Sequence, residues 1–297
     1  MSSALAPGIV AVAVGAAASA ALIWRASQNF EKQGRQRRRR IRCITFDLDD
    51  TIWACEPVIS RASAAFMQFL EHELPLVFAQ FPTIERWRAH SRSVCAPGGA
   101  CTKPYDLSEV RRVALREAAR LAGMNAVDTE RAVELGFNEF MSIRNKVDDF
   151  VFDGAVRLLR RIRASGVQLG ALSNGNADVS KIKSLKGLFD FAVSPASAGA
   201  KKPDMAPFRL ALQLSICDHA HEMIHVGDSL CSDVWPAQEF GVDKAVWVKT
   251  GSVWSGTHPS CSKASDGGDS ECRGEGDVQV ESLTELEALL VKWRVIE

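Results

Sequence analysis

Residues 41–53 read IRCITFDLDDTIW, and this stretch decides the fold. Its first half, 41–46, is a short apolar run of the kind that forms a strand buried in a parallel sheet. An acidic turn, 47–51, follows where such a strand would end. Further short apolar runs lie at 167–172, 191–193, 223–226 and 245–248. Helical patterns alternate with these runs, which predicts an α/β fold with a parallel sheet.

The residues between the first two predicted strands show no strand pattern. They contain helical patterns at 58–70, 107–122 and 127–146, and a loop at 91–105 that is rich in glycine and proline. We therefore expect residues 54–150 to form a helical insertion, the cap, folded over the sheet. The remaining residues, 41–53 and 151–297, would form the core that holds the sheet.

The C-terminal part of the core has two further features. A short helix is expected at 233–240, closed by the glycine at 241. Residues 251–276 are rich in Ser, Gly and Asp and have few large apolar side chains, so we expect a flexible loop there. A short segment at 277–280 and an amphipathic helix at 283–291 close the chain.

The charge of the chain is divided between two segments. Over 297 residues, 36 Lys and Arg balance 36 Asp and Glu, but residues 1–42 alone carry eight cations and one anion, a net charge of +7. The remainder therefore carries −7. An acidic body argues against a nucleic-acid-binding enzyme, because a phosphate backbone is neutralised by a basic surface. The 46% of hydrophobic residues excludes a disordered or collagen-like chain.

Residues 1–40 are expected to be a hydrophobic membrane anchor or a targeting segment. No charged side chain occurs in residues 1–24, a length that could cross a bilayer as a helix. For an anchor, the arginine run at 37–40 would place the following domain on the cytosolic side. The alternatives are an organellar targeting sequence for a plastid or mitochondrion, a secretory signal, or a structural helix. The arginines could equally contact anionic lipid headgroups, resemble a nuclear-import signal, or be simply solvated.

The eight cysteines are scattered, with no C-x-x-C pair. This spacing argues against a zinc ribbon and against a disulfide scaffold. It favours small, mostly buried free thiols, and therefore a reducing compartment.

Polar residues gather where the predicted strands end. In an open parallel sheet these ends lie at one edge, where ligands bind. The residues in question are Asp47, Asp49 and Thr51 after the first strand, Ser173 and Asn174 after the second, Lys202 after the third, and Asp228 and Asp233 after the fourth. Several carboxylates repel one another unless a cation joins them. We expect Mg²⁺, since it prefers oxygen ligands and bridges to a substrate phosphate.

Asp47 and Asp49 are expected to divide the chemistry between them. Two residues apart on an ending strand, their side chains point toward the same region. One can attack phosphorus and form an aspartyl-phosphate, while the other moves the proton of the leaving group and of the incoming water. Ser173 and Lys202 would hold the non-bridging phosphoryl oxygens.

Together these residues resemble the four motifs of the haloacid dehalogenase-like hydrolase superfamily. The order is the same: D-x-D-x-T at 47–51, a serine at 173, a lysine before proline at 202, and GDSLCSD at 227–233. The resemblance covers residues 41 to about 292. It implies a Rossmann-like core with a helical cap of the C1 type inserted just after the first motif, where the helical block lies.

The resemblance also implies a role for each residue. Asp47 would be the nucleophile and a Mg²⁺ ligand, Asp49 the general acid/base with its carbonyl on the metal, and Asp228 the other carboxylate ligand. Asp233 would be a supporting acid. The phosphate-binding residues would be Thr51, Ser173, Asn174 and Lys202. The acid at 49 favours phosphate-ester hydrolysis, since dehalogenases of this superfamily lack it. Asp50 stands where many members have glycine, a change that we expect to be tolerated.

Three longer stretches around these motifs narrow the resemblance to one branch of the superfamily. FDLDDTIW, ALSNGN and HVGDSLCSDV look most like a branch that dephosphorylates flavin mononucleotide (FMN) or the 5-amino-6-(5-phosphoribitylamino)uracil precursor of riboflavin. The expected function is Mg²⁺-dependent hydrolysis of a small-molecule phosphate ester, with FMN and riboflavin-pathway phosphates as candidates. The alternatives are a phosphatase of another sugar phosphate or nucleotide, and a membrane-tethered, non-catalytic binding protein.

Four residues allow a second interpretation. Lys201 competes with Lys202 to supply the ammonium group. Asp233 can instead cap the helix that it begins. His225 lies inside an apolar strand, and we expect a core histidine. The indole of Trp53 either stacks on a flat leaving group or packs in the core between sheet and cap.

Overall fold

The computed structural model describes residues 40–249 and 278–297. The described residues from 41 onward belong to one compact unit. The predictions for the N-terminal segment 1–40 and for the flexible loop 251–276 therefore fall outside the described residues, apart from residue 40. Within the described ranges, no helix combines the length and the apolar character that crossing a membrane requires.

The core is built on a six-stranded sheet in which every pair of neighbours is parallel. The strand order is β3-β2-β1-β4-β5-β6. The strands are β1 (Cys43–Phe46), β2 (Gln168–Leu172), β3 (Phe191–Val193), β4 (Met223–Gly227), β5 (Lys244–Val248) and β6 (Val278–Val280). The predicted α/β class and parallel sheet are confirmed, although β1 begins at Cys43 rather than at residue 41. Helices separate most of the strands along the chain, as the alternation predicted.

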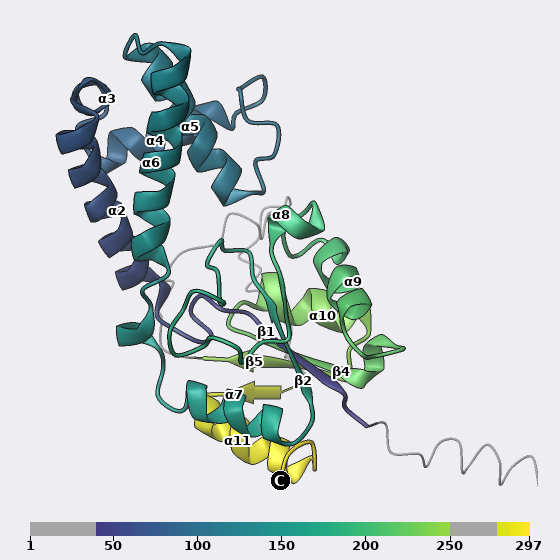
Figure 1. Cartoon of the computed structure of the whole chain (residues 1–297). Coiled ribbons are helices and arrows are strands. Elements are labelled where there is room, and N and C mark those ends of the chain that lie inside the picture. Colours follow the sequence, from purple (N-terminus) through teal and green to yellow (C-terminus); the bar gives the residue numbers. More distant parts are fainter. Residues whose placement is uncertain (1–39, 250–277) are drawn as a thin grey trace, which may run out of the picture. The chain divides into compact units, whose positions relative to one another are not determined.

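Helices cover both faces of the sheet, which explains why its strands are mostly apolar. Figure 1 shows α7 (Ala155–Ala164) and α11 (Leu283–Lys292) on one face, and α9 (Met205–Leu214) and α10 (Trp235–Phe240) on the other. A short helix, α8 (Pro195–Ala198), precedes α9. The helix predicted at 233–240 begins at Trp235, because residues 230–234 form a wider turn of π-helix.

The chain leaves the sheet after Trp53 and returns at Val151, where the two residues form an antiparallel bridge. Two backbone hydrogen bonds reinforce this crossing, from the Ala54 N–H to the Phe150 carbonyl at 3.0 Å and from the Phe152 N–H to the Ile52 carbonyl at 2.9 Å. The two connections are thus held side by side. The division of residues 41–297 into core and cap stays a prediction.

The cap segment contains a short 3₁₀-helix (Asp148–Phe150) and five α-helices, where three helices were predicted. The α-helices are α2 (Cys55–Glu73), α3 (Pro75–Gln80), α4 (Ile84–Val94), α5 (Leu107–Leu121) and α6 (Ala126–Arg144). Helix α4 overlaps the predicted loop at 91–105. It is capped by Thr83, whose side chain accepts a hydrogen bond from the Arg86 N–H at 3.3 Å. The five helices share a hydrophobic cluster that includes Phe66, Trp87 and Phe140.

The six cysteines among the described residues are free thiols. Two of them, Cys43 and Cys101, are buried and the other four are partly exposed, so fewer are buried than their spacing led us to expect.

Candidate active site

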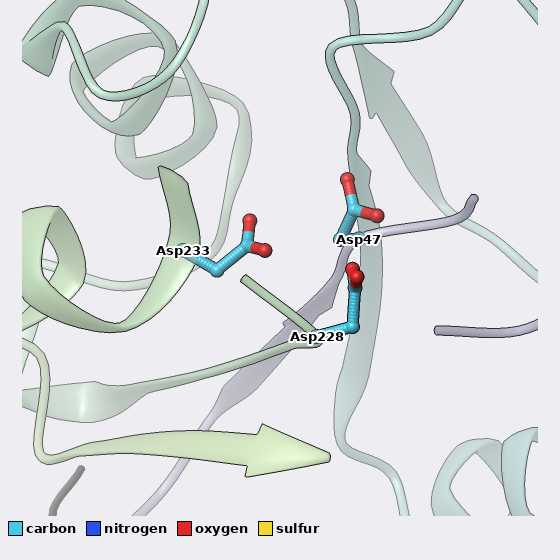
Figure 2. Close-up of side chains that lie close together, drawn as sticks. All are labelled: Asp47, Asp228 and Asp233. Carbon is cyan, nitrogen blue, oxygen red and sulfur yellow. The ribbon is translucent and has the colours of Figure 1, made fainter. Parts of the chain in front are cut away.

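The register of the three central strands brings the predicted site together. Residues 43–46 of β1 pair with 168–171 of β2 and with 223–226 of β4, so the three strands end at the same edge. Asp47 follows β1 and Asp228 follows β4. Side-chain oxygens of Asp47, Asp228 and Asp233 lie within 4.8 Å of one another, and Figure 2 shows the three carboxylates converging.

Lys202 supplies the positive charge of this cluster. Its ammonium group donates to Asp47 Oδ1 at 2.8 Å, to the Leu172 carbonyl at 2.6 Å, and to Asp233 Oδ1. Burial opposes the charge, but Asp233 and Asp47 outweigh it and raise the pKa of Lys202 above its ordinary value. Lys202 therefore stays charged although its side chain is only 1% exposed. Lys201 is exposed, so Lys202 is the lysine that reaches the site.

Asp233 is more deeply buried than Asp47, and both of its carboxylate oxygens have partners. Besides Lys202, it contacts His225 Nε2 at 3.3 Å and accepts the Ser229 N–H at 3.0 Å. Burial opposes its charge, but Lys202 and His225 outweigh burial and lower the pKa of Asp233 to about 2. Its carboxylate does not cap α10, which begins without a side-chain cap. Asp233 thus sits where a supporting acid is expected.

A glycine is required next to Asp233. A Cβ atom at Gly227 would lie 2.3 Å from the Asp233 Cγ atom, a distance that no side chain tolerates. The glycine of the GDS sequence therefore makes room for the carboxylate. His225 is buried in the core, as expected, but it also belongs to this network through its contacts with Asp233 and with Thr45 Oγ1 at 2.9 Å.

Asp47 and Asp228 carry more negative charge than Lys202 neutralises. Burial and the neighbouring carboxylates Asp233 and Asp228 raise the pKa of Asp47 well above its ordinary value, although Lys202 opposes them. Burial, Asp233 and Asp50 raise the pKa of Asp228 to about 7. A divalent cation between these carboxylates would relieve the repulsion, and a set of carboxylate oxygens suits Mg²⁺. The residues present therefore fit the predicted metal.

Asp49 faces a different set of partners. Its carboxylate accepts the Trp53 indole N–H at 2.8 Å, and both of its oxygens accept from Arg144 Nη2, at 2.7 and 2.6 Å. Gly175 lies against it, because a Cβ atom there would come within 2.4 Å of Asp49 Oδ2. Its side chain is thus turned toward the cap, where Arg144 ends α6. A metal contact from Asp49 would have to come from its backbone carbonyl, as the resemblance implies.

The four residues expected to bind phosphate differ in their surroundings. Ser173 lines a pocket of about 280 Å³ at the strand ends, which we call the strand-end pocket. The amide of Asn174 is occupied at both ends by the Lys202 backbone, accepting its N–H at 2.7 Å and donating to its carbonyl at 2.9 Å. Thr51 is fully buried, and its hydroxyl donates to Asp228 Oδ1 at 3.2 Å.

These contacts change the interpretation of three of the four. The side chain of Asn174 holds the Lys202 loop, and Thr51 orients a carboxylate. Lys202 donates to two carboxylates and a carbonyl. Of the four, only Ser173 is among the residues that line the strand-end pocket, and its Oγ accepts the Gly175 N–H at 3.0 Å.

Trp53 has no exposed surface. Its ring lies in the core beside the crossing to the cap, and its N–H is bound to Asp49. The structure favours the second interpretation of this residue, a core tryptophan. Stacking on a leaving group would require the indole to leave its place.

Asp50 adopts a left-handed backbone conformation, with φ of 61°. This explains why glycine suits the position, and aspartate is one of the few other residues that tolerate it. Its carboxylate accepts the Cys55 N–H at 2.9 Å, which fixes the start of α2.

Arg144 is the main site residue that the sequence did not reveal. It is buried and forms the ion pair with Asp49, yet it is a cation in the last turn of a helix, where cations are common for electrostatic reasons. Nothing in the sequence pattern distinguishes it from the other arginines of the cap.

Comparison with known proteins defines the class. A family model for haloacid dehalogenase-like hydrolases matches residues 41–241, so the chain belongs to this family. It is 27% identical over 214 residues to the 5-amino-6-(5-phospho-D-ribitylamino)uracil phosphatase YigB of Escherichia coli (strain K12), covering 71% of this chain and 84% of that protein. It is 35% identical over 102 residues to the glyceraldehyde 3-phosphate phosphatase of Pyrococcus abyssi (strain GE5 / Orsay), covering 33% of this chain and 42% of that protein. The expected class, a haloacid dehalogenase-like phosphatase, is thereby confirmed.

Solved structures agree on the fold. A 2-haloacid dehalogenase from Pseudomonas syringae pv. Tomato DC3000 superposes with a TM-score of 0.69 at 28% identity, covering 85% of this chain and 99% of that chain. A HAD phosphatase from Thermococcus onnurineus gives a TM-score of 0.51 at 19% identity, covering 84% and 97%, which supports the fold alone.

Proposed function

We propose that this protein hydrolyses phosphate monoesters of small molecules through a covalent aspartyl-phosphate on Asp47. The observation that carries the proposal is the arrangement around β1: one carboxylate held by a buried lysine, and a second, two residues on, held separately by Arg144 and Trp53. Two carboxylates with different partners suit two different tasks.

Asp47 acts as the nucleophile. Lys202 binds its Oδ1 atom, and the structure describes no hydrogen bond to Oδ2, which is the oxygen left to attack phosphorus. A bond forms between Oδ2 and phosphorus while the bond from phosphorus to the leaving oxygen breaks. The attack requires the ionised carboxylate, and the ammonium of Lys202 favours that form.

Asp49 moves the protons. It donates one to the departing alkoxide oxygen, then takes one from the water that attacks the phosphoryl group and frees Asp47. Arg144 and Trp53 fix its position for both steps. Two nitrogens of Arg144, Nε and Nη1, are buried with no hydrogen-bond partner among the described residues, and they can donate to oxygens of the bound ester.

Mg²⁺ would be held by Asp47 and Asp228, with the Asp49 carbonyl as a further ligand. When bound, it supplies positive charge that offsets the negative charge of the phosphoryl oxygens. Thr51 keeps the Asp228 carboxylate in place through its hydroxyl. Ser173, at the wall of the strand-end pocket, donates to a phosphoryl oxygen.

The substrate is a small phosphate ester. The curated relatives are named for a ribitylaminouracil phosphate and for glyceraldehyde 3-phosphate. FMN, riboflavin-pathway phosphates and small sugar phosphates are therefore the first candidates.

The test is release of inorganic phosphate by the purified full chain, with Mg²⁺ and with EDTA. The panel contains p-nitrophenyl phosphate, FMN, sugar phosphates and nucleotides, and a 2-haloacid assayed for halide release. We expect Mg²⁺-dependent phosphate release that Asp47→Asn abolishes. Equal rates for wild type and Asp47→Asn would favour a non-catalytic binding protein, and halide release without phosphate release would favour a dehalogenase.

A further inference from the structure

The cap contains a second pocket, also of about 280 Å³. We call it the cap pocket. It is lined by Arg88 and Arg92 of α4 and by Arg111 of α5, with aromatic walls at Trp87 and Phe140. None of the described residues that line it is acidic. Asn176, which follows the Ser173 loop of the core, also belongs to its wall.

The three arginines of the cap pocket have no carboxylate partner in the described part of the chain. Other arginines of α5 differ from Arg111 in having carboxylate partners. Arg112, Arg116 and Arg120 all form ion pairs, with Glu134 at 4.0 Å, Glu130 at 2.6 Å and Glu117 at 2.8 Å respectively. Helix α5 therefore has glutamates within reach of these three arginines, whereas no glutamate is among the described residues that line the pocket.

Arg111 has the most constrained position of the three. Its guanidinium carbon lies 3.3 Å from the centre of the Phe140 ring and 5.6 Å from that of Phe66, so aromatic faces hold it in place. Its Nε atom is buried without a hydrogen-bond partner among the described residues. Burial and the nearby Arg144 lower the pKa of Arg111 to about 9. A buried cation without a counter-ion is costly, and an anion beside it would repay that cost.

The cap pocket adjoins the strand-end pocket. Leu107 and Asn176 line both this pocket and the strand-end pocket, whose wall also contains Ser173 and Gly175. Arg144 lies near enough to Arg111 to repel it and contacts Asp49 directly. A leaving group that passes from Asp47 beside Ser173 and Asn176 would reach the three arginines.

We infer that the cap pocket binds a second anionic group, a carboxylate or a phosphate, at the far end of the substrate. The preferred substrates are then phosphate esters with another negative charge remote from the reacting phosphorus. This inference rests on the proposed function and narrows its substrate class. Guanidinium groups pair with carboxylate and phosphate oxygens alike, so both kinds of anion belong to the prediction.

Matched pairs of esters test the inference. 3-Phosphoglycerate is compared with glycerol 3-phosphate, which replaces the carboxylate by a hydroxymethyl group, and fructose 1,6-bisphosphate with fructose 6-phosphate, which lacks the second phosphate. For at least one pair, we expect wild-type kcat/KM to be about tenfold or more higher for the member with the extra anion, which is worth about 1.4 kcal/mol. The pair with the larger ratio distinguishes a carboxylate from a phosphate.

Arg111→Gln should lower this ratio at least fivefold, mainly through KM of the more anionic ester. Arg88→Gln and Arg92→Gln, at exposed positions that can hardly affect folding, should lower it in the same direction. Arg112→Gln and Arg86→Gln are the matched controls on α5 and α4, since neither residue lines the cap pocket. Their ratios should stay at the wild-type value.

Two results would overturn the inference. One is a wild-type ratio of one or less for both pairs, or a preference for FMN, whose ring is uncharged at neutral pH, over every more anionic ester. The other is an equal fall of the ratio in Arg111→Gln and Arg112→Gln. Calorimetric binding of the same pairs to Asp47→Asn with Mg²⁺ gives the ratio without turnover. If no ester is hydrolysed, the proposed function fails, while the binding ratio still decides the inference.

Discussion

The catalytic edge of the sheet and the cap pocket both hold charged groups, but their charges are organised in opposite ways. At the catalytic edge, Lys202 is bound by Asp47 and Asp233, and the excess charge is negative. In the cap pocket, Arg88, Arg92 and Arg111 contact no carboxylate of residues 40–249 or 278–297, and the charge of these lining residues is positive. The first arrangement suits a metal ion and a reaction at phosphorus. The second arrangement suits recognition of an anionic leaving group of the ester.

This contrast also answers how an acidic body attracts an anionic substrate. Residues 43–297 carry a net charge of −7, so the field of the whole protein does not favour phosphate esters. Attraction must be local, and the sheet edge alone is negative without a metal. The cap pocket adds a positive region beside it. A substrate with two anionic ends would therefore meet a favourable charge at each end only when Mg²⁺ is bound.

Among changes that keep the nucleophile Asp47, the largest effect is expected from Asp49→Asn, which removes the proton donor. For alkyl phosphates, kcat should fall about 10²–10⁴-fold, since their leaving oxygen needs a proton. For p-nitrophenyl phosphate the fall in the first step should be much smaller, since nitrophenolate leaves readily. The two members of each matched pair should lose activity equally, because the change lies in the core. If kcat fell by different factors for the two members of a pair, catalysis at the sheet edge and recognition in the cap pocket would not be separate.

A substitution of Lys202 tests how differently the two regions respond to the loss of a cation. Lys202→Met should destabilise the protein by about 3–5 kcal/mol, because it leaves the buried carboxylates Asp47 and Asp233 without their partner. Urea unfolding at pH 7 measures this. Arg111→Met should cost about 1 kcal/mol or less, since it strands no carboxylate. Lys201→Met, at an exposed position, is the control and should stay within about 0.5 kcal/mol of wild type. Equal losses of unfolding free energy in Lys202→Met and Arg111→Met would contradict the proposed difference between the sheet edge and the cap pocket.

The excess negative charge at the sheet edge should appear as a pH dependence of stability in metal-free protein. The pKa of Asp228 is about 7 in the folded protein, above its ordinary value, so the folded state keeps this proton when the unfolded state has lost it. Stability should therefore fall as pH rises from about 4 to 7. Between pH 5 and 8, wild type should lose about 2–3 kcal/mol relative to Asp228→Asn.

Mg²⁺ provides the control for this measurement. It should restore wild-type stability at pH 8, where Asp228 is ionised, and should have less effect on Asp228→Asn. Identical unfolding curves for the two proteins across this pH range, with and without metal, would show that Asp228 neither holds excess charge nor binds the metal.

The core was predictable from the sequence because its signals are local. Five of the six strands are short apolar runs that the sequence predicts, and site residues follow the first four. The sixth, β6, has the sequence VQV and gives no such signal. The cap was less predictable. Helix α4 was assigned in part to a loop because its buried residues, Trp87, His90 and Val94, are few and one is polar. Its helical structure depends on packing against α5 and α2, which no local pattern records.

The candidate site shows the same limit. Asp47, Asp228 and Lys202 could be placed at one edge from strand ends alone. The contacts of Asn174 and Thr51 could not, because a polar side chain beside a site binds either the ligand or the protein, and only geometry decides. Arg144 could not be predicted for a related reason. It binds Asp49, 95 positions earlier in the chain, and only the folded cap brings the two residues together.

The smallest effect is expected from Trp53→Phe, at the crossing between the two regions. Phenylalanine keeps most of the buried ring but removes the N–H that Asp49 accepts, while Arg144 still holds the carboxylate. One charged hydrogen bond of several should cost about tenfold or less in kcat. Because the ring is buried, the loss should be equal for FMN and for aliphatic sugar phosphates, with KM little changed. A rise in KM confined to FMN would mean that the indole leaves the core and stacks on the substrate. Trp53 would then contribute, together with the cap, to recognition of the leaving group.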